Sequence, residues 1–266
     1  MVLRPGQAAI LSFAVPGLAH VLLGRPVRGL VAFALTVGAF AAGYAIVGDR
    51  LWYMEFMPQT SGIFRHVPVF VLPEFLNFGC TMVVAALRDA PTPDVLRHVL
   101  LPRPGEDFAL ALTGFSGYAA ALFAADAWWV ARGQRSGRMA PAAAAALTWM
   151  VPGSGHFLLG QRSKGLLTGA AVLIVFGLGL FFGGGHSVER SSYTLWWAGQ
   201  ALCGIGALFA ALVTAPGRMT EFPESLDLGY VLATCAGLMN LMLMTDAFTI
   251  AEESSPDFTA AREASA

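Results

Sequence analysis

Residues 15–24 read VPGLAHVLLG, and a short basic turn leads from them to Gly29 and Leu30. The same pattern returns at residues 151–160 as VPGSGHFLLG, again followed by a basic turn and a Gly-Leu pair. Because residue types and spacing both recur, the sequence predicts an internal duplication. The residues shared by the two copies are Pro16, Gly17, His20, Gly24 and Gly29 in the first and Pro152, Gly153, His156, Gly160 and Gly165 in the second.

The composition indicates that the chain lies in a lipid bilayer. Of its 266 residues, 56% are hydrophobic and 12% are charged, whereas soluble domains carry about 25% charged residues. The net charge of -1 gives no basic field for nucleic acid, so no nucleic-acid partner is expected. The three cysteines stand singly in apolar runs, which indicates neither a disulfide framework nor a metal site.

Eight apolar runs are each close to the roughly 20 residues that a helix needs to cross a bilayer. We therefore predict an all-α integral membrane protein of about eight transmembrane helices, arranged as two tandem four-helix repeats. The predicted helices cover about 7–23, 27–47, 67–87 and 108–131, then 141–159, 165–182, 193–213 and 228–251. The predicted domains are a first repeat at 1–131, a basic linker at 132–138, a second repeat at 139–251 and a polar acidic tail at 252–266.

The first helix of each repeat is interrupted by its Pro-Gly pair, which removes a backbone donor and favours a bend. A kinked spanning helix is the favoured interpretation, and a re-entrant hairpin is the alternative. Eight spans would place both termini on one face and the two basic turns on the other. The basic residues then divide evenly between the faces, so the positive-inside rule predicts no orientation.

The two histidines are the first candidates for chemistry, since each lies in an apolar segment one turn before the glycine that ends its helix. Asp107 and Asp227 begin the fourth helix of each repeat, and we expect them on the same face as the histidines. Such pairs could be linked to protons. The favoured interpretation is structural: the acids act as first-turn residues and the histidines hydrogen-bond the turn.

Three further carboxylates are possible polar partners. Asp126 and Asp246 lie roughly 28 Å along their helices from Asp107 and Asp227, at about 1.5 Å per residue. We therefore expect them at the opposite face. Glu74 is either deep in the membrane and functional, or a first-turn acid after Pro73; the second interpretation is favoured.

At Gly17, His20, Leu23, Gly24, Gly29 and Leu30, and at Gly153, Gly155, His156, Leu159, Gly160, Gly165 and Leu166, the sequence resembles the two-transmembrane-helix domain family. The tandem form is similar to an uncharacterised bacterial membrane family with a repeated Pro-Gly-x-Gly-His-x-x-Leu-Gly signature. The first copy departs from that signature at Ala19. The resemblance implies a fold and a location, since the two-helix family has no agreed biochemical activity.

No catalytic constellation, phosphate loop or dinucleotide fingerprint occurs in the sequence, so we predict no catalytic residue, cofactor or metal. The expected function is that of a non-enzymatic scaffold or assembly component. Its partners would be the lipid bilayer and other membrane proteins or itself. A small-solute or ion transporter with a path between the repeats is the first alternative, and a membrane-embedded enzyme that uses His20 or His156 is the second. The expected location is the bacterial cytoplasmic (inner) membrane.

Overall fold

The computed structural model describes residues 3–48, 51, 72–87, 105–134, 136–188, 194–213, 223–258 and 260, and these residues form helices and turns without a strand. Four of the described helices are long and apolar enough to cross a membrane: α3 (Pro26–Val47), α7 (Glu106–Ala131), α10 (Arg162–Phe182) and α13 (Leu226–Glu253). At about 1.5 Å per residue, the 22 residues of α3 reach about 33 Å, which matches the hydrocarbon thickness of a bilayer. The chain is therefore a membrane-embedded protein.

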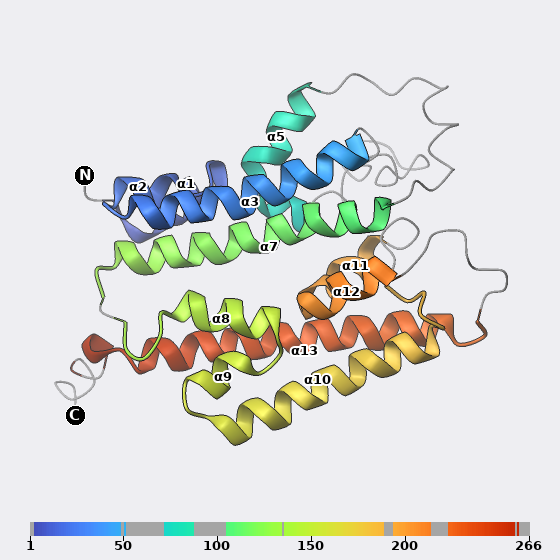
Figure 1. Cartoon of the computed structure of the whole chain (residues 1–266). Coiled ribbons are helices and arrows are strands. Elements are labelled where there is room, and N and C mark those ends of the chain that lie inside the picture. Colours follow the sequence, from blue (N-terminus) through green and yellow to red (C-terminus); the bar gives the residue numbers. More distant parts are fainter. Residues whose placement is uncertain are drawn as a thin grey trace, which may run out of the picture.

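The two halves of the chain follow the same order of elements (Figure 1). In each half, two short helices precede a long one, an interrupted segment follows, and a second long helix closes the half. The first half contains α1 (Pro5–Ala14), α2 (Leu18–Leu22), α3, η3 (Pro73–Leu76), α5 (Phe78–Leu87) and α7. The second contains α8 (Pro141–Met150), α9 (Ser154–Leu158), α10, α11 (Thr194–Gln200), η4 (Ala201–Cys203), α12 (Ile205–Val213) and α13.

The first segment of each half is a re-entrant hairpin, so the favoured prediction of a kinked spanning helix is wrong. After α8 the chain reverses, and α9 folds back beside it: Gly155 donates its N–H to the Thr148 hydroxyl and lies against the Ala144 carbonyl. In the first half, Leu3, just before α1, and Ala19 in α2 share one apolar cluster with the end of α7. α1 and α8 have only 10 residues each, too few to cross a bilayer. The chain therefore reverses at the Pro-Gly pair before it has crossed.

The third segment of each half is also interrupted. The short helix η3 turns at Asn77 into α5, and α11 and η4 turn at Gly204 into α12. Residues 67–71 of the predicted helix lie outside the described residues. Within the described part of the chain, neither segment contains a helix of spanning length.

These two corrections change the expected topology. We call the end of the bundle where α2 passes into α3 and α9 into α10, at residues 23–26 and 159–162, the turn end. From there α3 and α10 run to the far end, and α7 and α13 return (Figure 1). The long helices of both halves therefore run in the same order of directions, while α1 begins and α13 ends at the turn end rather than opposite to it.

Long helices pack in pairs within each half, α3 along α7 and α10 along α13. The two halves meet through α7 and the elements α8, α12 and η4. Phe115 of α7 packs against Trp149 of α8 with ring centroids 4.4 Å apart and the planes tilted by 33°, and the Tyr118 hydroxyl donates to the Ala198 carbonyl at 2.5 Å. Aromatic side chains therefore carry the contact between the halves.

Candidate functional site

The first polar cluster lies at the turn end, where the hairpin α1–α2 meets the last turns of α7. His20 is completely buried, and its Nε2 lies 3.1 Å from Oδ2 of Asp126. A carboxylate only accepts hydrogen bonds, so the imidazole donates its Nε2 proton to it. Arg28, in the first turn of α3, places its Nη1 3.3 Å from Oδ2 and 3.4 Å from Oδ1 of the same carboxylate.

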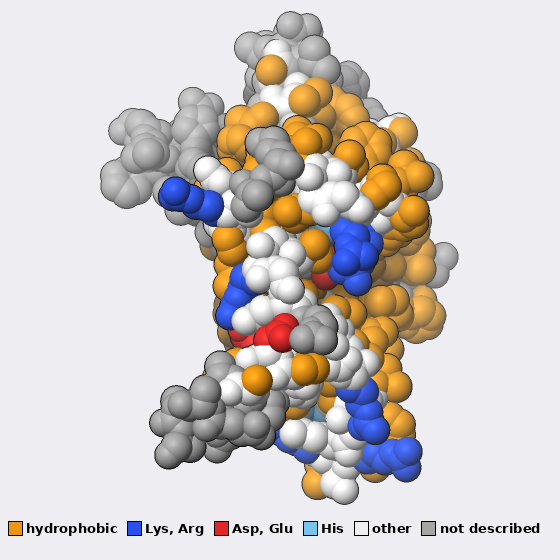
Figure 2. All heavy atoms as spheres, turned by 90° about the vertical axis from the view of Figure 1, so that its left-hand side faces the viewer, with side chains coloured by type: hydrophobic (Ala, Val, Ile, Leu, Met, Phe, Trp, Pro, Cys, Tyr) orange, Lys and Arg blue, Asp and Glu red, His pale blue; other side chains and the backbone are white. Residues whose placement is uncertain are grey.

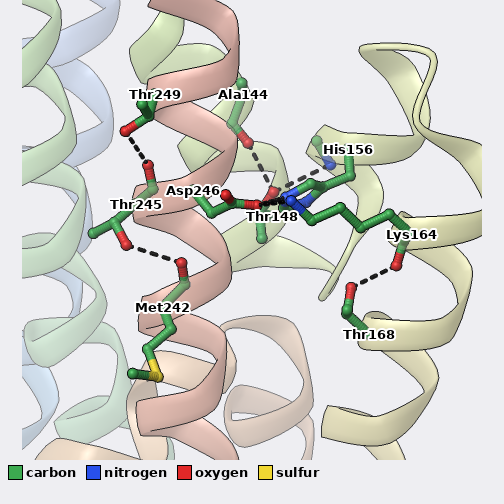
Figure 3. Close-up of polar contacts among 10 residues, drawn as sticks. Ala144, Thr148, His156, Lys164, Thr168, Met242, Thr245, Asp246 and Thr249 are labelled. Carbon is green, nitrogen blue, oxygen red and sulfur yellow. Dashed lines mark hydrogen bonds and ion pairs between the residues drawn. The ribbon is translucent and has the colours of Figure 1, made fainter.

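The second half builds the same cluster (Figure 3). His156 is completely buried, and its Nε2 lies 2.6 Å from Oδ2 of Asp246 on α13. Lys164 Nζ lies 2.6 Å from the same oxygen. Each half therefore joins three segments, its hairpin and its two long helices, through one histidine, one aspartate and one basic side chain.

The two clusters differ in exposure. The Asp126 side chain is 13% exposed and its basic partner is held at 3.3 Å, whereas the Asp246 side chain is 41% exposed and has the closer cation. The first cluster thus depends more on its histidine.

The Pro-Gly pair places each histidine. Gly17 and Gly153 adopt φ of 85° and 82°, the left-handed region that glycine enters without steric cost. A methyl group on either would overlap a backbone carbonyl oxygen, that of Gly29 or Gly165 respectively. The close approach of hairpin and long helix therefore needs glycine on both sides, which explains why the motif ends in Gly29 and Gly165.

The turn after each histidine is closed by backbone bonds. Gly24 and Gly160 follow α2 and α9, and the next residues, Arg25 and Gln161, donate their N–H groups to the carbonyls of His20 and His156 at 2.8 and 2.9 Å. The imidazoles bind carboxylates and not, as was expected, the turn. The turn is instead closed by the backbone hydrogen bonds to the two histidine carbonyls.

The expected pairing of the histidines with Asp107 and Asp227 is wrong, and so is the placement of Asp126 and Asp246 at the opposite face. Asp126 and Asp246 do lie far along their helices from Asp107 and Asp227, but it is their end of α7 and α13 that meets the turns. Because α1–α2 and α8–α9 do not cross, the turns lie at the end where α7 and α13 finish, which brings Asp126 and Asp246 to the histidines. Asp107 and Asp227 lie in the first turns of α7 and α13.

The basic partners Arg28 and Lys164 were missed by the analysis of the sequence. Each follows its histidine by eight residues, and this shared spacing is the signal that could have identified them. On a helix that starts at the turn, this spacing places the side chain in the first or second turn, beside the carboxylate.

Glu74 lies in the first turn of the short helix that Pro73 begins, and it is also completely buried. Its Oε1 accepts a hydrogen bond from the Thr113 hydroxyl at 2.8 Å, and its backbone carbonyl accepts one from Thr81. The neighbouring Asn77 amide donates to the Ser116 hydroxyl at 3.2 Å. A polar cluster therefore lies inside the first half, between η3, α5 and α7.

The second half has an amide at the position of Glu74. A methyl on Gly117 of α7 would overlap the carbonyl of Pro73, and a methyl on Gly237 of α13 would overlap that of Gly199. Glu74 and Gln200 each follow those carbonyl residues directly and are both buried. The carboxylate is thus specific to the first half.

A cavity of about 470 Å³ opens beside the first cluster, between α3, α7 and α8. Arg28 and Asp126 border it, and its other lining residues are apolar: Val27, Val31, Leu35, Phe115, Ala119, Leu122, Phe123, Ala140, Ala142, Ala143, Ala146, Trp149 and Met150. Neither histidine nor Glu74 lines this cavity. Its walls suit an apolar group rather than a hydrated ion.

Charged side chains gather at the turn end, where Figure 2 shows basic and acidic groups side by side. Arg132 Nη1 pairs with Oε1 of Glu252 at 2.5 Å and lies over the Trp128 ring, so it links the predicted linker to the predicted tail. Arg135 of the linker lies outside the described residues.

Comparison with known proteins agrees with the doubled architecture. A family model matches residues 7–138 and, a second time, residues 143–257, which together cover most of the chain. The chain belongs to DUF6677, a family of unknown function. No curated protein and no solved structure matches the chain.

The double match to DUF6677 is consistent with the tandem-repeated, uncharacterised family expected from the motif. The gap between the two matches, residues 139–142, falls after α7 and at the start of α8, where the chain passes from one half to the other. The Pro-Gly-x-Gly-His-x-x-Leu-Gly signature and the likeness to the two-transmembrane-helix domain family stay predictions.

Proposed function

We propose that this member of DUF6677 is a non-enzymatic scaffold or assembly component of the membrane. The observation that carries the proposal is the way its interrupted helices meet. At the tip of the first hairpin, Gly79 lies against the Ala14 carbonyl, and at the second, Gly204 lies against that of Trp149. A methyl group would not fit at either glycine. Backbone contact of this kind supports closed packing rather than a path.

The amide of Asn240 adds to this packing. It donates to the carbonyls of Leu202 and Trp149 at 2.8 and 3.4 Å, so it pairs backbone groups that the helix breaks leave without a helical partner. Non-helical backbone is tolerated at membrane depth when it is buried in protein or lines a water-filled cavity. At the second hairpin, the contacts of Asn240 support non-helical backbone that is buried in protein.

One arrangement favours the transporter as a second candidate. Broken helices whose ends point into the membrane are a common feature of substrate and ion sites in transporters. Here the hairpin α1–α2 enters from the turn end, and its tip at Ala14 meets the start of α5, close in sequence to the buried Glu74. A small solute or ion could use such a junction between the two repeats.

Flux measurements separate the two candidates. The purified chain is reconstituted into liposomes that contain pH-, K⁺- and Na⁺-sensitive dyes, and flux is compared with empty liposomes. The scaffold proposal expects no excess flux at any pH between 5 and 8, the range in which histidine titrates. It is overturned by a saturable flux that disappears in Glu74→Gln and persists in Glu253→Gln, an exposed control at the turn end. Gln fits at residue 74 because the second half carries Gln200 at the equivalent position.

The histidines give the same assay a second readout. If a transport path uses them, His20→Gln and His156→Gln would preserve folding and remove a pH-dependent flux. A scaffold would show no flux in either variant or in the parent.

We also propose that the protein resides in a bacterial cytoplasmic membrane with its turn end in the cytoplasm. All seven described basic residues lie at the turn end: Arg4, Arg25, Arg28, Arg132, Arg138, Arg162 and Lys164. These residues lie in or beside the short connections of the turn end, and Lys and Arg in short loops favour the cytoplasmic side. The other nine of the sixteen basic residues lie outside the described part of the chain.

Accessibility labelling tests this orientation. In a background with Cys80, Cys203 and Cys235 replaced by serine, a cysteine at Gln161 is expected to react with a membrane-impermeant maleimide only after cells are opened. A cysteine at Glu224, at the far end, is expected to react in intact cells. Labelling in the reverse order would show the opposite orientation, and labelling of both in intact cells would contradict the assignment of the two ends.

A further inference from the structure

The contact between the two halves covers one face of α7, and the equivalent face of α13 has no partner within the described chain. Ala111, Phe115, Tyr118 and Leu122 follow each other at helical spacing along α7 and pack against α8, η4 and α12. Ala111 is only 4% exposed. This face of α7 is the first half's side of an established apolar interface.

The matching face of α13 is found by a constant offset of 120 residues. Gly117 and Gly237 make the same contact with the preceding segment, and Asp126 and Asp246 make the same contact with the histidines. By this offset, the positions on α13 equivalent to the α7 face are Val231, Cys235, Leu238 and Met242. These side chains are exposed, by 39% at Val231, 49% at Leu238 and 72% at Met242. In Figure 3, Met242 projects from α13 away from His156 and Lys164.

A complementary surface is also present, and it is partly exposed. Trp149 and Ala145 of α8 pack against α7, and an offset of 136 residues, fixed by His20 and His156, converts them into Phe13 and Ala9 on α1. Phe13 and Ala9 are half-buried, and their neighbour Ile10 is 69% exposed. In the interrupted segment, Gly79 and Gly204 make equivalent contacts with the hairpins and give an offset of 125 residues, by which the buried Ala207 of α12 corresponds to the exposed Met82 of α5. One half thus presents, on α1 and α5, the counterpart of the surface that the other half uses on α8 and α12.

We propose that a second copy of this chain docks its α1–α5 surface onto the α13 stripe Val231, Cys235, Leu238 and Met242. The contact repeats between chains the packing that joins the two halves within one chain. Such an interface is head-to-tail, and it closes into a ring or extends according to the rotation between subunits. In the absence of a partner the stripe would face lipid. In a membrane, helices associate mainly through close packing of their side chains.

The inference deepens the proposed scaffold role by naming one partner, and it rests on that role only for its biological meaning. Self-association is measured separately from flux. A monomer would therefore overturn this inference and leave the flux test of the scaffold role unchanged.

Disulfide trapping between copies tests the register of the interface. Phe13 and Cys235 correspond to Trp149 and Phe115, whose rings are in contact. In a background with Cys80→Ala and Cys203→Ala, Phe13→Cys is expected to form an oxidant-dependent product of two or more 28.0 kDa chains in native membranes. The product should be lost in Cys235→Ser. Ile174→Cys, at an exposed position in the middle of α10, is the matched control and should give no product.

Two further results complete the test. Copies carrying only Phe13→Cys and copies carrying only Cys235 should crosslink to each other when they are coexpressed. If Phe13→Cys does not fold, the pair Ala9→Cys with Leu238→Cys, without Cys235, replaces it. A Cys235–Cys235 product without the second cysteine would show a symmetric contact and overturn the head-to-tail arrangement. A chain that is monomeric by native mass spectrometry and yields no crosslink with either pair would overturn the inference as a whole.

Discussion

Gly153→Ala is expected to remove most of the folded protein, and Gly17→Ala is expected to do the same in the first half. Two costs add at each site. A non-glycine residue in the left-handed region costs about 1–2 kcal/mol, and forcing a methyl group against the facing carbonyl costs about 1–3 kcal/mol by overpacking. The total is a large share of the roughly 5–15 kcal/mol that stabilises a folded protein. Size-exclusion chromatography and thermal unfolding in mild detergent measure the loss.

The matched control is Gly177→Ala, in the middle of α10. An added methyl there meets no atom within 4 Å, and the backbone is ordinary helix. Alanine should therefore be neutral or raise the unfolding temperature, since glycine inside a helix is less favourable by roughly 0.5–1 kcal/mol. Gly43 would be a poor control, because a methyl there would approach the Ala109 carbonyl. Equal tolerance at Gly153 and Gly177 would contradict the role assigned to the Pro-Gly reversal.

His20→Leu is expected to destabilise the protein by about 1–3 kcal/mol, the usual cost of leaving a buried polar group without its partner. Asp126 is mostly buried and would keep only Arg28, a half-exposed side chain at 3.3 Å. His156→Leu should cost less, about 0–1 kcal/mol, because Asp246 is more exposed and keeps the close Lys164. Thermal unfolding of the two variants in the same detergent gives the comparison.

Two companion variants show whether the hydrogen bond is the cause. His20→Gln, which keeps a donor, should stay closer to the parent than His20→Leu. Adding Asp126→Asn to His20→Leu should recover part of the loss, because the uncompensated carboxylate is removed together with its partner. A larger effect of Leu at residue 156 than at residue 20, or full additivity of the double variant, would show that packing of the imidazole matters more than its bond to the aspartate.

Composition and the repeated motif were sufficient for the coarse picture. Long apolar runs predicted helices in a membrane, and four of them are described as continuous helices of spanning length. The recurrence of the Pro-Gly pair, the histidine and the later glycines predicted two equivalent halves, and the structure gives these residues the same local geometry in both. These features are readable from sequence because hydrophobicity and glycine or proline chemistry act locally.

The depth to which each apolar segment enters the membrane was decided by the tertiary structure. Residues 7–23 are apolar enough to span, but the chain reverses at Gly17, and that choice depends on Gly29 and Gly79 accepting the hairpin backbone at close range. A reversal in the first segment changes the membrane face at which each later helix begins and ends. It therefore also determines which carboxylate meets each histidine. Sequence alone identified His20, His156 and the set of acids; only the packing of the hairpins against α7 and α13 could select Asp126 and Asp246, because such pairing depends on distances between segments 90 residues or more apart.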